Sequence, residues 1–156
     1  MTTFNPPLNK SIPVELAIID SALLKGRLVL LQDLSENGIN PHTLVGGIEP
    51  LTYLHQFDLL SVDFLEVFFN GFLTNKDKGL LLGLNAKSYL NFGLLDEHLR
   101  HVRMACQKYN RWAFVVLRGF DHPRTEYQPD IVYRIEHDNP AQVKVIKNRL
   151  QGADDV

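Results

Sequence analysis

The chain has 156 residues, of which 45% are hydrophobic and 22% are charged, and its net charge at pH 7 is −2. This composition is typical of a globular domain with a sizeable core and excludes a largely disordered chain. The single cysteine, Cys106, excludes an internal disulfide framework, and no apolar run reaches the roughly 18 residues of a membrane span. Because the N-terminus also lacks the features of a signal peptide, we expect a cytoplasmic protein that does not enter membranes.

The front of the chain has helical periodicity. Residues 1–10 are polar and contain prolines, which predicts a disordered lead. Ser11 then fits the cap of a helix that runs to Ser35, with Pro13 in its first turn. Apolar residues at helical spacing would form one face of it, namely Leu16, Ile19, Leu23, Leu30 and Leu34.

Glycine-containing turns divide the next part of the chain. Gly38 ends the first helix, and two short helices are predicted to begin at Pro41 and Pro50. Residues 61–73 have the capping pattern of a helix and the aromatic content of a strand, and we favour a helix. The sequence therefore predicts a helical assembly unit over residues 11–75.

In the back of the chain, apolar residues recur at helical spacing in some segments and at strand spacing in others. Residues 94–110 predict a four-turn helix, and residues 112–117 and 131–136 have the pattern of two short strands. The pair Asn139-Pro140 predicts a terminal helix, followed by a frayed tail over residues 151–156. The apolar stripe of the helix at 94–110 consists of Leu95, Leu99, Val102, Cys106 and Tyr109, and that of the terminal helix consists of Val143, Ile146 and Leu150.

These elements predict a mainly α protein, with a helical N-terminal unit and a small α+β C-terminal part. The C-terminal part covers residues 76–150 and contains the two short strands and the terminal helix. The two parts can also form one continuous domain.

No residue pattern indicates catalysis. Glu97, His98 and His101 could place two metal ligands on one helix, but a third ligand is missing and a solvated helix start explains the same residues. The glycines lack the lysine and hydroxyl of a phosphate-binding loop, and no serine or cysteine stands in a nucleophile motif. We therefore predict a non-enzymatic protein without catalytic residues, cofactor or metal.

Charge divides the chain into an acidic front and a basic back. Through Glu66 it carries three basic and eight acidic residues, whereas Lys76 to Arg149 contains thirteen basic and eight acidic ones. A basic half can bind DNA phosphates by releasing counterions, although complementary halves or plain solvated faces explain the same pattern. The predicted phosphate contacts are Arg100, Arg103, Lys108, Arg111, Lys144 and Lys147.

The run from Asp33 to Leu54 resembles the D subunit of the bacterial flagellar master transcriptional activator. The resemblance covers residues 17–68 and lies in the tripeptide Gly38-Ile39-Asn40 and in the spacing of Leu44, Leu51 and Leu54. It implies an α-helical dimer that joins a second, zinc-binding subunit to activate transcription. Related D-like subunits are encoded on integrative and conjugative elements.

The sequence therefore predicts a DNA-associated transcriptional regulator or regulator subunit of a mobile genetic element. It would act as a homodimer or with a second regulator subunit. The expected subunit interface consists of Leu16, Leu23, Leu30, Leu34 and Phe68. The alternative is a protein-binding adaptor without a nucleic-acid role, whose interface would consist of Phe64, Phe68, Phe69 and Phe72.

Overall fold

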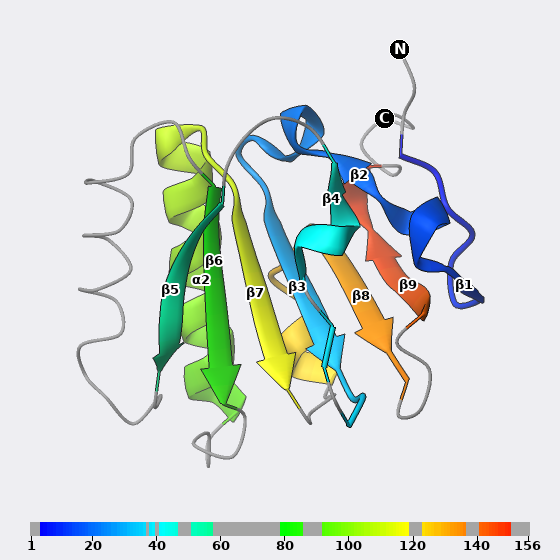
Figure 1. Ribbon diagram of the computed structural model, residues 1–156. Coiled ribbons are helices and arrows are strands. Elements are labelled where there is room, and N and C mark those ends of the chain that lie inside the picture. The colour runs from blue at the N-terminus through cyan, green and yellow to red at the C-terminus, as the bar shows by residue number, and fades with distance from the viewer. Residues whose placement is uncertain are drawn as a thin grey trace.

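A seven-stranded mixed sheet forms the centre of the protein in the computed structural model (Figure 1). The structure describes residues 4–36, 38–39, 41–46, 51–57, 79–85, 92–118, 123–136 and 141–150. Its strands are β1 (Ser11–Pro13), β3 (Leu28–Asp33), β5 (Leu51–Phe57), β6 (Gly79–Asn85), β7 (Ala113–Arg118), β8 (Ile131–Ile135) and β9 (Gln142–Asn148). Their order across the sheet is β1-β9-β8-β3-β7-β6-β5, and the five strands from β8 to β5 are parallel to one another.

Short elements and one long helix cover the two faces of this sheet. Figure 1 shows α2 (Phe92–Tyr109) and the 3₁₀ turn η5 (Pro123–Glu126) behind the sheet. In front lie the 3₁₀ turn η3 (Pro41–Leu44) and a small parallel sheet of β2 (Ile19–Asp20) and β4 (Val45–Gly46). The 3₁₀ turns η1 (Val14–Ala17) and η2 (Ser21–Leu24) precede and follow β2.

The predicted mainly α fold is wrong, because α2 is the single α-helix longer than one turn in the part of the chain that the structure describes. The helix expected from Ser11 to Ser35 is replaced by short elements and by β3. Leu28 to Leu31 are all fully buried, because β3 lies in the middle of the sheet and is covered on both faces. A continuous apolar run therefore fits this strand as well as it fits a buried helix.

Three further expected helices are also wrong. The segment from Pro41 forms the turn η3 and then β4, and the segment after Pro50 forms β5. The helical fold that the family resemblance implies is therefore absent from the described part of residues 17–68. The terminal helix is replaced by β9, because Val143 and Val145 alternate with exposed or half-buried neighbours and pack into the core. Residues 61–73 lie outside the described part of the chain.

The helix predicted over 94–110 and the strands predicted over 112–117 and 131–136 are confirmed as α2, β7 and β8. The buried residues of α2 include Leu95, Leu99, Val102 and Cys106, as the stripe requires, whereas Tyr109 at its end is 38% exposed. The two confirmed strands are parallel and pair with opposite sides of β3. Strands from both halves of the sequence therefore share one sheet.

One core cluster lies on the face that carries η1 to η3. Tyr133 belongs to it: its ring stacks on Phe114, with 6.5 Å between the ring centroids, and its hydroxyl donates to the Ala17 carbonyl at 2.8 Å. Burial raises the pKa of the Tyr133 hydroxyl above its ordinary value. Among the described helices, none is long and apolar enough to cross a membrane.

Candidate nucleic-acid interface

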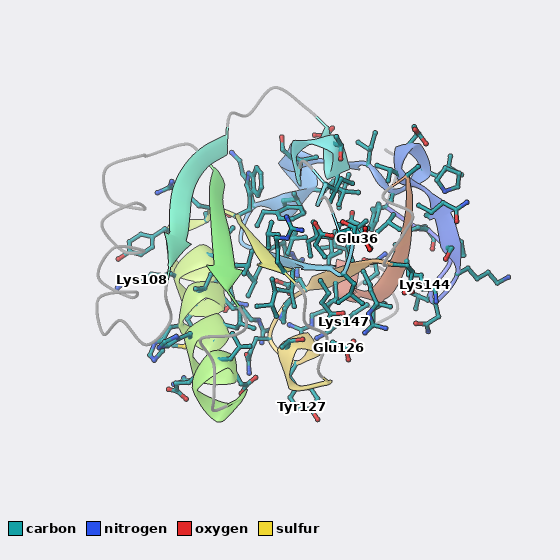
Figure 2. All side chains as sticks on the ribbon, turned by 60° about the horizontal axis from the view of Figure 1, so that its bottom comes forward. Glu36, Lys108, Glu126, Tyr127, Lys144 and Lys147 are labelled. Atoms are coloured by element: carbon teal, nitrogen blue, oxygen red, sulfur yellow. The ribbon has the colours of Figure 1, made fainter. Side chains whose placement is uncertain are left out.

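The six cations predicted to contact DNA lie on two separate elements and on the chain beside one of them. Arg100, Arg103 and Lys108 belong to α2, and Arg111 lies between α2 and β7. The other two, Lys144 and Lys147, are on β9. Figure 2 shows Lys108 far from Lys144 and Lys147, towards the opposite edge of the molecule in that view. The six residues therefore do not form one continuous footprint.

Three of the cations on or near α2 have local partners or are buried. Arg100 pairs with Glu97, and this hydrogen bond and its charge lower the pKa of the Glu97 carboxyl. The Lys108 ammonium lies 5.4 Å from the centre of the Tyr109 ring, a cation–π distance. Arg111 is 8% exposed, which leaves little of it for a large ligand.

The two lysines of β9 differ from each other. Lys144 pairs with Glu136 at 3.0 Å in a partly exposed ion pair. Lys147 instead donates to two backbone carbonyls at the end of η5, those of Glu126 at 2.8 Å and Tyr127 at 3.0 Å. Figure 2 shows Lys147 beside these two residues.

Lys147 also lies in an electrostatic environment that disfavours its own charge. Partial burial is the main cause that lowers its pKa to about 8, and repulsion by Arg149 and Arg103 lowers it further. Attraction by Asp130 and Glu126 acts in the opposite direction and is outweighed. We call Arg103, Lys147 and Arg149 the cationic cluster.

Asp130 is the main buried counterion next to this cluster. Its carboxylate is 1% exposed, accepts a hydrogen bond from the Leu28 amide at 2.8 Å, and pairs with Arg149 at 3.2 Å and Arg27 at 3.7 Å. Glu126 is occupied by Arg134 at 3.1 Å. Arg103 forms no ion pair with any carboxylate in the described ranges, so among the described residues the three cations of the cluster outnumber its acidic neighbours Asp130 and Glu126.

Sequence reasoning did not identify Asp130 or Arg27 as part of this site. Asp130 precedes the apolar run of β8, and an acidic residue at such a position is usually a solvated turn residue. Only the packing of β8 against β3 buries its carboxylate beside the Leu28 amide. The pairing of strands therefore defines the site.

The histidines of α2 do not assemble a metal site with other described residues. His101 Nε2 lies 3.3 Å from the Glu97 carboxylate, which is also bound by Arg100. Burial is the main cause that lowers the pKa of His98, and the neighbouring His101 lowers it further. No group of three potential ligands surrounds a common point within the described ranges.

The residues expected at a subunit interface differ widely in how deeply they are buried. Leu16 is 68% exposed and Leu23 is half-buried, and both line an open pocket of about 720 Å³ near the N-terminus. Leu30 is fully buried in β3, and Leu34 is half-buried just after it. Phe68, like Phe64, Phe69 and Phe72 of the alternative interface, lies outside the described residues.

The cationic cluster is thus a half-buried group of three positive charges between α2, η5 and β9, with fewer acidic than basic members among the described residues around Lys147. Arginine and lysine in such an arrangement can bind phosphate oxygens. A comparison with protein-family models finds no match for this chain, and a comparison with curated proteins finds no significant similarity.

Proposed function

We propose that this protein is a cytoplasmic, non-enzymatic, DNA-associated regulator or regulator subunit that contacts DNA phosphates through the cationic cluster. It would act as a homodimer or with a second regulator subunit, and a mobile genetic element is the proposed origin. The observation that carries the proposal is the convergence of Arg103 and Arg149 on the half-buried Lys147, whose charge both arginines disfavour.

The physical argument concerns the charge of Lys147. Its ammonium is held close to two other cations, and Asp130 and Glu126 do not restore its ordinary pKa. A phosphate placed beside the cluster would attract all three cations and would raise the pKa of Lys147 towards its ordinary value. Each neutralised phosphate also releases counterions from the duplex, which adds affinity at low salt.

The first test is the salt dependence of DNA binding by the full chain, measured by fluorescence anisotropy with a labelled duplex. We expect the logarithm of the affinity to fall linearly with the logarithm of salt concentration. Lys147→Gln and Arg103→Gln should each weaken binding and reduce that slope by about 0.9, the change for one phosphate contact. Lys25→Gln removes the same charge from an exposed site outside the cluster and serves as the matched control.

The second test uses pH. A lysine with a pKa near 8 is charged below that pH and neutral above it, so DNA affinity should decrease as the pH rises through about 8. Lys147→Gln should remove this pH dependence while the salt dependence from Arg103 and Arg149 remains. No binding at low salt, or binding that is indifferent to both salt and Lys147→Gln, would contradict the proposal.

A further inference from the structure

The neighbouring strands β3 and β7 are parallel, but the chain leaves their carboxyl ends towards opposite faces of the sheet. After β3 it reaches η3 and β4, in front of the sheet in Figure 1, whereas after β7 it reaches η5, behind the sheet. Open α/β sheets bind ligands where the connections of adjacent strands diverge in this way. The last residues of these two strands, Asp33 and Arg118, lie opposite each other in the register.

Asp33 fixes the chain that follows β3. One carboxylate oxygen accepts hydrogen bonds from the amide of Ser35 at 3.0 Å and from its hydroxyl, and the other accepts from the amide of Ile39 at 3.0 Å. The side chain is 1% exposed. Its negative charge is therefore directed at donors of its own loop, which holds Ser35 and Ile39 in place.

Arg118 lies against the same loop. Its Nη2 donates to the carbonyls of Ser35 and Glu36, both at 3.2 Å. Gly38 has a φ of +75°, and a Cβ at this position would lie 2.5 Å from Nη1 of Arg118. Glycine therefore suits the backbone conformation here, and a side chain at this position would displace the guanidinium from its place.

The remaining donors of Arg118 have no partner among the residues that the structure describes. Its side chain is exposed, its Nε and Nη1 groups have no hydrogen-bond acceptor within the described ranges, and it forms no ion pair with a described carboxylate. The guanidinium is thus held in place by neutral carbonyls, and its charge is not offset by a direct partner there. Glu36, whose carbonyl accepts from Arg118, is an exposed acidic residue of the same loop.

We propose that Arg118, held against this loop, binds the phosphate group of a small ligand at the carboxyl ends of β3 and β7. A guanidinium presents two parallel N–H groups that match two phosphate oxygens, and its fixed position reduces the entropy lost on binding. The negative charge of Glu36 opposes an anion and so limits the affinity. Inorganic phosphate and a phosphate monoester share this chemistry.

The test is an NMR titration of the full chain with inorganic phosphate, a nucleoside monophosphate or acetate at constant ionic strength. Both phosphates should give saturable shifts of the Gly38 and Ile39 amides, and tighter binding of one of them identifies the source of the phosphate group. Arg118→Gln should weaken phosphate binding by about tenfold or more, the effect of losing a charge-assisted hydrogen bond.

Two further variants change the site without removing the arginine. Gly38→Ala should weaken binding by displacing the guanidinium at unchanged charge, and Glu36→Gln should strengthen it. Lys25→Gln, at an exposed position before β3, is the control that should leave the phosphate affinity unchanged.

A structural role alone for Arg118 would give a different result. In that case Arg118→Gln would lower the thermal unfolding temperature, but phosphate would raise that temperature equally in the variant and in the unaltered protein. That outcome would overturn the proposal. So would the absence of saturable shifts, or shifts of equal size with acetate.

Discussion

Replacing Asp130 with asparagine removes a buried negative charge while nearly preserving the shape of the side chain. The carboxylate is 1% exposed and interacts with the Leu28 amide, Arg149 and Arg27. Loss of one partner from a fully buried ion pair costs about 3–5 kcal/mol. Here the two arginine side chains are 34% and 30% exposed, so water offsets part of that cost, and the new amide oxygen can still accept from Leu28. We therefore expect Asp130→Asn to lower the free energy of unfolding by about 2–3 kcal/mol.

Urea unfolding followed by circular dichroism measures this difference. The matched control is Glu97→Gln, which removes a carboxylate that also pairs with an arginine but lies on the exposed face of α2. That variant should unfold at the same urea concentration as the unaltered protein. A destabilisation by Asp130→Asn below about 1 kcal/mol, the range for surface ion pairs, would refute the reasoning that Asp130 is a buried anchor.

Three further predictions concern the core. Leu30→Ala should lower the free energy of unfolding by about 2–5 kcal/mol because Leu30 is fully buried in β3. Leu16→Ala, at a 68% exposed site, should change it by less than about 0.5 kcal/mol. Equal effects of the two variants in urea unfolding would contradict the burial of Leu30 in the sheet. Tyr133→Phe removes a buried hydrogen bond and should cost about 1–2 kcal/mol in thermal unfolding, with Tyr127→Phe as the exposed control. Burial raises the pKa of the Cys106 thiol, so we expect a thiol reagent to label it slowly until urea unfolds the protein, and rapid labelling of the native protein would count against this burial.

Local sequence patterns identify only some of the residues in the two candidate sites. The basic character of the back half is visible in composition, and the sequence predicts Lys147 and Arg103 among the phosphate contacts. Their proximity is not visible there, because it depends on how β9 pairs with β8 and how α2 packs behind the sheet. No local pattern distinguishes Arg118, since its position beside Gly38 arises from the parallel pairing of β3 with β7.

The sequence by itself determined the elements that have one apolar face. The clearest is α2, whose buried positions recur at helical spacing, so that the local period specifies the conformation. The tertiary structure alone decided β3 and β9. Leu28 to Leu31 are apolar at every position, which suits a strand buried on both faces as well as a helix. In β9, Val143 and Ile146 match a helix while Val143 and Val145 match a strand, and the hydrogen bonds supplied by β8 and β1 selected the strand. A backbone needs partners for its polar groups, and those partners are distant in the sequence.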